Sequence, residues 1–214
     1  MRLGLFGGTF NPIHIAHLRI AEEALELATL DRVLFIPASD PPHKSLAGEA
    51  DFSLRYNMVK KAIADNPAFD ISDIEKRRAG KSYTVDTLSQ LRLEQPEEEL
   101  HFIIGSDSFL ELGLWHRYPE IFKQASLIVV ERPEKEILDP LLQLPEDVLG
   151  QFTQEESYLL RHSGGNVIRF FTGTRLDISS SRLREMVLEK QSIRYLVPPV
   201  IEKFIAQKGL YQHE

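Results

Sequence analysis

The stretch LGLFGGTFNPIHIAHL, residues 3–18, contains the pattern that decides the fold. An apolar run of strand length, Leu3–Phe6, ends at two glycines, and an Asn-Pro turn follows before a helical pattern begins. This order is how α/β proteins build phosphate sites, because the first N–H groups of a helix have no acceptor within the helix. His14 and His17 lie three residues apart at that helix start, so both imidazoles share one face. The stretch therefore predicts a nucleotide site.

Three further apolar runs resemble this first strand in length and composition. They are uninterrupted rather than alternating, which is typical of parallel strands buried on both faces. The runs are Val33–Ile36, Phe102–Ile104 and Leu127–Val130. Helical patterns cover His14–Thr29, Leu54–Ile63 and Thr84–Leu93. Strands that alternate with helices predict an α/β fold: a doubly wound, Rossmann-like parallel sheet with helices on both faces.

The second half of the chain is less regular. Residues 131–156 are acidic and interrupted by prolines, which indicates a surface excursion that is partly helical. A last strand is expected at Asn166–Phe171. Serines at 179–181 are good N-caps for the next helix. A final helix, Val200–Gln207, is expected between Pro199 and Gly209. Residues 1–214 are thus predicted to form a single domain in which residues 178–214 make a small C-terminal helical cap.

Composition narrows the class of partner. The formal net charge is -7, whereas a nucleic-acid surface normally shows a basic excess, so no nucleic acid is expected as the main partner. There is no cysteine, which excludes disulfides and thiolate metal sites and suits a reducing compartment. No run approaches the ~18 apolar residues of a membrane span. We expect a soluble, cytoplasmic protein with no membrane partner.

The first stretch also lacks the signatures of two large nucleotide-binding classes. No Lys-Ser/Thr pair follows the glycine turn, which excludes a Walker loop, and Gly-x-Gly-x-x-Gly is absent. Gly7 and Gly8 either let backbone approach a ligand or serve the geometry of the turn alone. For His14 and His17 the alternatives are helix capping and, less favoured for want of a third ligand, a metal site.

A second candidate site is Ile178–Arg184, with the sequence ISSSRLR. Its simple interpretation is a helix cap with solvated arginines. Its functional interpretation is a second helix N-terminus that offers hydroxyls, amides and a guanidinium to phosphate oxygens. Two such sites could hold one polyphosphate from opposite sides. Lys44, in a proline-stiffened loop, is either a third cation or an ordinary surface lysine.

Together these motifs carry a resemblance to a known family. Residues 7–17 resemble the H-x-G-H signature of the nucleotidyltransferase superfamily, and Ile178–Arg184 is similar to its I-S-S-T/S-x-x-R motif. The likeness extends to bacterial nicotinate-nucleotide adenylyltransferases over most of the chain and is weakest at 134–165. Its further motifs are Pro41-Pro42-His43-Lys44, Lys81–Leu88, Ile104–Asp107, Trp115 and Arg132-Pro133.

The resemblance implies a reaction and a set of residues. The phosphate of nicotinate mononucleotide would attack the α-phosphorus of ATP in line, releasing pyrophosphate and forming deamido-NAD. His17 and His14 would be catalytic, His17 by donating to the α-phosphate, and Mg²⁺ would be held through phosphates and water rather than by a protein metal site. The implied ATP and phosphate residues are Gly7, Gly8, Thr9, Phe10, Lys44, Gly105, Asp107, Ile178, Ser179, Ser180, Ser181 and Arg184. The implied nicotinate mononucleotide residues are Tyr83, Thr84, Trp115 and Arg132.

Two positions depart from the family pattern. Ala16 stands where the signature has Gly, so we expect a modest change in adenine packing, and Asn11 stands where Asp is frequent. Pantetheine-phosphate adenylyltransferase is the main rival, although it lacks the Tyr83-Thr84 context. A nucleotide-binding sensor without turnover is a second rival, and a class I aminoacyl-tRNA synthetase is disfavoured by length and acidity. Preference for nicotinate over nicotinamide mononucleotide, and a possible homo-oligomer, are left open.

Overall fold

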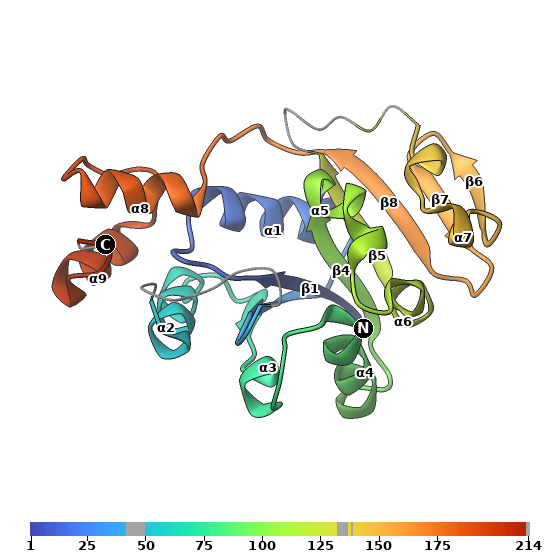
Figure 1. Ribbon diagram of the computed structural model, residues 1–214, viewed down its shortest axis with the longest axis horizontal. Coiled ribbons are helices and arrows are strands. Elements are labelled where there is room, and N and C mark those ends of the chain that lie inside the picture. The colour runs from blue at the N-terminus through green and yellow to red at the C-terminus, as the bar shows by residue number, and fades with distance from the viewer. Residues whose placement is uncertain (42–49, 132–136, 138, 213–214) are drawn as a thin grey trace.

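One eight-stranded sheet organises the protein (Figure 1). The computed structural model describes residues 1–41, 50–131, 137 and 139–212. The strand order is β3-β2-β1-β4-β5-β8-β7-β6. The strands are β1 Arg2–Gly8, β2 Arg32–Pro37, β3 Phe69–Ile71, β4 Glu99–Gly105, β5 Ser126–Glu131, β6 Phe152–Glu156, β7 Leu159–His162 and β8 Val167–Thr172. All four apolar runs and the expected last strand are therefore confirmed as strands.

The sheet is parallel from β3 to β8 and antiparallel beyond it. The antiparallel part is a β6–β7 hairpin, which the sequence did not predict. The excursion was expected to be partly helical, and η3 (Leu141–Gln143) and α7 (Glu146–Leu149) are helical. The hairpin that follows them adds two strands to the sheet edge. The predicted doubly wound fold is confirmed, with this extension.

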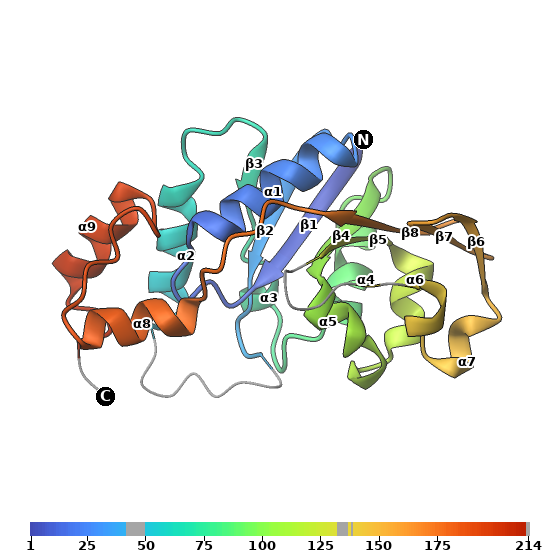
Figure 2. The ribbon, with the colours of Figure 1, turned by 90° about the horizontal axis from the view of Figure 1, so that it is seen from above.

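Helices cover both faces of the sheet, as Figures 1 and 2 show. The helices are α1 Ile15–Leu27, α2 Phe52–Ala62, α3 Ile74–Arg77, α4 Thr84–Glu94, α5 Ser106–Leu110, η1 Leu112–Leu114, η2 Tyr118–Glu120, α6 Ile121–Gln124, α8 Ser180–Leu188 and α9 Pro199–Lys208. One core contains buried residues of α4 and α6, and the other contains buried residues of α1, α2 and α9. The predicted helices after β1, β2 and β3 are thus confirmed within three residues at each end.

The central strands explain why the apolar runs are uninterrupted. In β1, Leu3 and Leu5 belong to one core and Phe6 to the other. In β4, Ile103 and Ile104 divide in the same way. Successive side chains of a strand point to opposite faces, so a strand with helices on both faces must be apolar at every position.

The C-terminal helices form a separate group at one end of the molecule, opposite the β6–β7 hairpin (Figure 1). Ser179 caps α8 by accepting from the backbone N–H of Arg182 at 3.2 Å. Gly209 ends α9 in the left-handed conformation, with φ of 60°. Both of these helix ends were predicted. The group of C-terminal helices packs against α2 through α9.

The strand order reverses direction between β1 and β4. From β1 the chain continues outward through β2 and β3, and then returns to add β4 on the other side of β1. In doubly wound folds, ligands bind outside the carboxyl ends of the strands at such a switch point. Among the described residues, no helix is long and apolar enough to cross a membrane.

Candidate active site

A cleft of about 420 Å³ opens at this switch point. Its floor is the carboxyl end of β1, from Phe6 to Gly8, and of β4, from Phe102 to Gly105. The loop after β1 forms one wall and the start of α8 forms another. The lining from these walls is Thr9, Phe10, Asn11, His14, His17, Ile178, Ser179, Ser180, Ser181 and Arg184, with Asp107, Ser108 and Trp115 from the β4 side. Two motifs 160 residues apart in sequence therefore face one cavity.

The two histidines lie together at the start of α1. His14 is its N-cap and is buried, and the His14 and His17 rings stack with centroids 3.6 Å apart. The His14 backbone N–H donates to Nδ1 of His17 at 3.3 Å. Because Nδ1 accepts this bond, a neutral His17 ring carries its proton on Nε2 and is a hydrogen-bond donor there. Helix capping thus uses Nδ1 of His17, whereas the functional interpretation uses Nε2 of the same ring.

The loop after β1 is held by side chains of the C-terminal cap. Arg184 Nη1 donates to the Asn11 carbonyl at 2.8 Å, and Ser180 Oγ donates to the Pro12 carbonyl at 2.9 Å. The Tyr211 hydroxyl donates to Asn11 Oδ1 at 2.6 Å. Ser180 and Arg184 were predicted as phosphate ligands, and in the structure both also position the loop.

The two glycines of the turn differ in what surrounds them. A Cβ on Gly8 would lie 3.0 Å from the Phe10 ring, so the ring would have to shift if this residue carried a side chain. A Cβ on Gly7 would meet Phe102 at 3.5 Å, an ordinary contact. Packing therefore disfavours a side chain at Gly8 and tolerates one at Gly7.

The segment that leads into α8 is anchored by Glu23 of α1. Its carboxylate accepts from the Thr174 backbone N–H at 3.0 Å and from the Thr174 hydroxyl, and it pairs with Arg19 at 2.8 Å. Burial of the carboxyl opposes ionisation, but the hydrogen bonds from Thr174 and Arg19 outweigh it and lower the pKa of Glu23. The carboxylate of Glu23 is thus favoured in its ionised form, and it holds Thr174 in the segment that leads to Ser179.

A smaller pocket of about 120 Å³ adjoins the cleft and shares Gly7, Gly8, Phe102 and Trp115 with it. Its other walls come from β1, β2 and the residue after it, α3, the connection from α3 to α4, and the first turns of α4. These residues are Leu5, Ile36, Ala38, Glu75, Ser82, Thr84, Thr87 and Leu88. The pocket is mostly apolar, and α4 begins at its wall with Thr84. Its apolar lining is suited to a flat ring.

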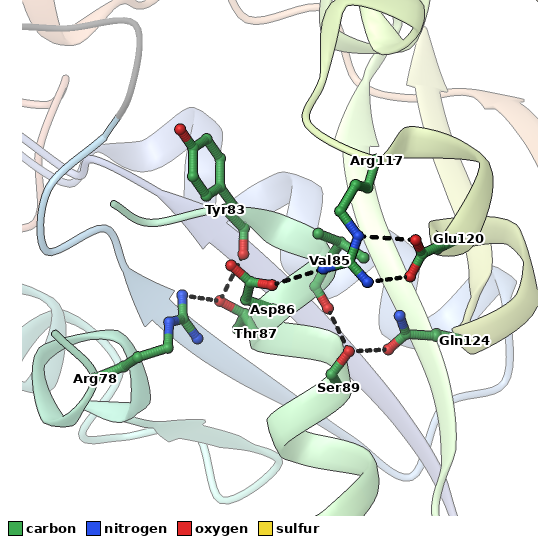
Figure 3. A network of polar contacts seen from close by, with 9 residues as sticks. All are labelled: Arg78, Tyr83, Val85, Asp86, Thr87, Ser89, Arg117, Glu120 and Gln124. Carbon is green, nitrogen blue, oxygen red and sulfur yellow. Dashed lines mark hydrogen bonds and ion pairs between the residues drawn. The ribbon is translucent and has the colours of Figure 1, made fainter. Parts of the chain in front are cut away.

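The carboxylate of Glu75 is the ionisable group in this pocket, and it is engaged by neighbours. It accepts from the Thr87 hydroxyl at 2.9 Å and from the Ser39 N–H at 3.4 Å. Arg78 Nη2 donates to that same hydroxyl oxygen at 3.1 Å (Figure 3). The chain of bonds from Arg78 to Glu75 fixes Thr87 at the pocket wall.

A surface network joins α4 to the segment that carries Trp115 (Figure 3). Arg117 lies 3.5 Å from Asp86 of α4 and donates to Glu120 at 2.8 Å. Arg117 is also left-handed, with φ of 50°. The His116 ring lies 4.3 Å from the Tyr83 ring. Two consecutive residues after Trp115 therefore contact the first turn of α4.

Some predicted site residues have other neighbours or fall outside the description. Tyr83 caps α4 and contacts His116, and it lines neither pocket. Ala16 is buried and does not line the cleft. Gly105 is the N-cap of α5, and Asp107 in its first turn lines the cleft. Lys44 and Arg132 lie outside the described residues.

Metal-binding capacity can be judged from the donor groups of the described chain. In residues 1–41, 50–131, 137 and 139–212, no three His, Asp or Glu side chains are placed to hold one ion. A magnesium ion bound here would need its other ligands from a phosphate and water.

Sequence reasoning missed Glu75, Phe102 as a shared wall, and Tyr211. Glu75 lies in a helical turn rich in charge, where a buried carboxylate has no distinguishing pattern. Tyr211 donates a hydrogen bond to Asn11, which lies 200 residues earlier in the sequence. For Phe102, the strand pattern predicted burial without indicating which end of the strand would face a cavity.

Comparison with known proteins identifies the family of this chain. The family model described as cytidylyltransferase-like matches residues 5–186. A probable nicotinate-nucleotide adenylyltransferase of Trichlorobacter lovleyi is 72% identical, covering 99% of this chain and 100% of the relative. One from Pelobacter propionicus is 56% identical, with 99% and 98% covered.

Solved structures show the same fold at low sequence identity. The Plasmodium falciparum nicotinic acid mononucleotide adenylyltransferase complexed with NaAD has a TM-score of 0.77 at 19% identity, covering 100% of this chain and 98% of that one. The same enzyme complexed with APC has a TM-score of 0.76 at 18% identity over the same shares. With a family model matching most of its length and relatives above 50% identity, the chain belongs to the nicotinate-nucleotide adenylyltransferase family of cytidylyltransferase-like proteins.

Proposed function

We propose that this protein transfers the adenylyl group of ATP to nicotinate mononucleotide, giving deamido-NAD and pyrophosphate. One observation carries the proposal: a polar cleft bounded by two helix starts adjoins a small apolar pocket, and Trp115 lines both. The cleft suits a polyphosphate, because helix N-termini favour anions. The pocket suits a pyridine ring. The transferred phosphorus would lie where the two spaces meet, beside Gly7.

ATP would occupy the larger cleft with its phosphates between the β1 loop and the start of α8. Backbone from Gly7 to Phe10 would contact the nucleotide, with Ser179, Ser180, Ser181 and Ile178 on the opposite side. Arg184 would bind the outer phosphates with the guanidinium N–H groups that do not bond to Asn11. Gly105 and Asp107 would hold a ribose hydroxyl. Lys44 is proposed as a further cation from the sequence motif alone.

His17 is proposed as the principal catalytic residue. Its Nε2–H would donate to an oxygen of the α-phosphate as negative charge builds there in the transition state. His14, stacked on it, would steady the outer phosphates. A phosphate monoester is already a nucleophile, so no covalent enzyme intermediate is needed. Catalysis then consists of positioning and of charge stabilisation on the transferred group.

Nicotinate mononucleotide would place its ring in the smaller pocket against Trp115. Its carboxylate would face the N-terminus of α4 at Thr84, where the helix dipole favours an anion. Glu75 lines the same pocket, but its hydrogen bonds from Thr87 and Ser39 compensate part of its charge. Tyr83 would act through its contact with His116, and Arg132 is proposed from the motif alone.

The described residues hold no cluster of three His, Asp or Glu side chains, so a magnesium ion would be held with ATP and would supply positive charge against the leaving pyrophosphate. The side chains of the cleft would bind the phosphate oxygens that the ion does not contact. We also propose a cytoplasmic location, which the absence of cysteine suits.

The direct test is pyrophosphate release by the purified protein with ATP and Mg²⁺. We expect turnover with nicotinate mononucleotide and at least tenfold lower kcat/KM with nicotinamide mononucleotide. Turnover with phosphopantetheine but not with either mononucleotide would assign the chain to the rival enzyme. Binding of ATP without turnover on any of the three would indicate a sensor instead.

A further inference from the structure

Arg55 of α2 is fully buried and its guanidinium joins two stretches of backbone. Nη1 donates to the Thr9 carbonyl at 2.8 Å, and Nε donates to the Ala50 carbonyl at 3.1 Å. A guanidinium is charged at neutral pH and is costly to bury unless its N–H groups are bonded. Neither the motifs nor the proposed mechanism uses this residue, although it contacts the loop that the mechanism depends on.

The bond to Thr9 fixes the direction of one peptide group. The Thr9–Phe10 peptide is trans, so its C=O and N–H point in opposite directions. The carbonyl points toward Arg55, and therefore the N–H of Phe10 points away from α2. Thr9 and Phe10 both line the cleft, whereas Arg55 does not. The Phe10 N–H is thereby directed away from Arg55, within a loop that lines the cleft.

The preceding peptide is held in the same way. The Ala38 N–H, just after β2, donates to the Gly8 carbonyl at 2.8 Å. The Thr9 N–H therefore also points away from the β2–α2 side. Phe10 follows in the left-handed conformation, with φ of 49°. Successive N–H groups turned to one side beside a left-handed residue form a concavity that binds anions.

We infer that Arg55 is a positioning residue for phosphate binding, holding the Thr9–Phe10 peptide so that its N–H meets the transferred phosphoryl group. The inference rests on the proposed function. A positioned donor of this kind stabilises charge that develops in the transition state, so its loss lowers kcat more than substrate affinity. The bond to Ala50 ties the same guanidinium to the residue preceding Asp51, the N-cap of α2.

Arg92 provides a matched control for a merely structural role. It is a partly buried arginine of α4 whose guanidinium also holds two carbonyls, those of Gln124 at 2.8 Å and Glu98 at 3.0 Å. It lines neither the cleft nor the smaller pocket. Losing its bonds destabilises the fold without touching the β1 loop.

The experiment compares Arg55→Met, Arg55→Lys and Arg92→Met with the unaltered protein. Thermal melting measures the folded fraction, and pyrophosphate release gives kcat per folded molecule. We expect kcat of Arg55→Met to fall by about ten- to a hundredfold, less than the roughly hundred- to thousandfold for removal of a transition-state donor, because the Phe10 N–H is misplaced but not removed. Arg55→Lys should recover part of this loss, because its ammonium can reach one carbonyl. Arg92→Met should lower the melting temperature and keep kcat within about twofold, because it loses only structural bonds.

A second readout is independent of turnover. In amide NMR spectra recorded without a mononucleotide substrate, ATP with Mg²⁺ should shift the Thr9 and Phe10 signals of the unaltered protein and of Arg92→Met, and shift them much less in Arg55→Met. If both readouts are the same for Arg55→Met and Arg92→Met, the inference is wrong. If the unaltered protein lacks turnover on nicotinate mononucleotide, the proposed function fails, and the ATP-induced shifts alone decide the role of Arg55.

Discussion

The two substrate walls of the cleft are stabilised in different ways. The β1 loop is held by side chains from three other parts of the chain, namely Arg55, Ser180 with Arg184, and Tyr211. The Trp115 segment is held by ring contacts of Trp115 with Phe102 and of His116 with Tyr83. It also makes an ion pair between Arg117 and Asp86, whose side chains are 49% and 35% exposed.

The difference indicates that the two walls are held with different rigidity. Partly buried hydrogen bonds, three of them to backbone carbonyls, depend little on salt and fix one geometry, whereas exposed ion pairs contribute ~0–1 kcal/mol and are screened. The wall proposed to meet the transferred phosphoryl group is therefore preorganised. We expect the wall proposed to meet the pyridine ring to be the more adjustable of the two. Three substitutions test this contrast, from the largest expected effect to the smallest.

Replacing His17, which lies on the preorganised wall, should lower turnover more than the other substitutions. Loss of the Nε2 donor in His17→Ala removes a transition-state hydrogen bond, and kcat should fall by roughly a hundred- to a thousandfold. The companion variant His17→Asn keeps an acceptor near the position of Nδ1 for the His14 N–H but has no donor at Nε2. We expect it to be as inactive as His17→Ala in steady-state pyrophosphate release while melting closer to the unaltered protein. Turnover by His17→Asn near the original rate would refute the donor role.

Ser180→Ala tests whether the C-terminal cap positions the loop. The Pro12 carbonyl loses its hydroxyl donor at 2.9 Å, at a cost of about 1 kcal/mol, so kcat/KM for ATP should fall about five- to tenfold. Ser89→Ala is the control, because its hydroxyl bonds to Val85 and Gln124 away from the cleft. Equal kinetics in the two variants, measured at saturating nicotinate mononucleotide, would show that the loop keeps its geometry without Ser180.

Arg117→Ala tests the adjustable wall and should have the smallest effect. It removes the 3.5 Å pair with Asp86, so KM for nicotinate mononucleotide should rise about two- to threefold at low salt, with kcat nearly unchanged. The rise should shrink at high salt, because salt screens exposed pairs. Arg161→Ala removes a comparable pair with Glu155 on the distant hairpin and should leave this KM unchanged. A large fall in kcat for Arg117→Ala would contradict the division between the walls.

The elements nearest the site were predictable because local rules determine them. Uninterrupted apolar runs identified β1, β2, β4 and β5. Residue type alone indicated an N-cap among the serines at 179–181, and Ser179 is that N-cap. The two motifs were expected to face one ligand, and they do line one cleft. Which of those side chains contact substrate stays a prediction.

The remaining features depend on contacts between distant segments. The β6–β7 hairpin has buried positions at Phe152, Leu159 and Leu160 but charged residues elsewhere, as is common in edge strands. Such a segment resembles a polar excursion in sequence. For Gly8 the sequence left approach to a ligand and turn geometry as alternatives, and packing against the Phe10 ring is a further constraint that only the fold shows. Arg55 gave no signal because one arginine in a helical pattern is normally exposed.

The hydrogen bond from Tyr211 to Asn11 has a consequence for the order of events during synthesis. Asn11 is synthesised 200 residues before Tyr211, its partner in this bond. The residues of β1, α1 and β2 are also complete long before the C-terminal helices exist. The bond from Tyr211 therefore forms only after synthesis has passed residue 211. Until then the β1 loop of the growing chain lacks this contact.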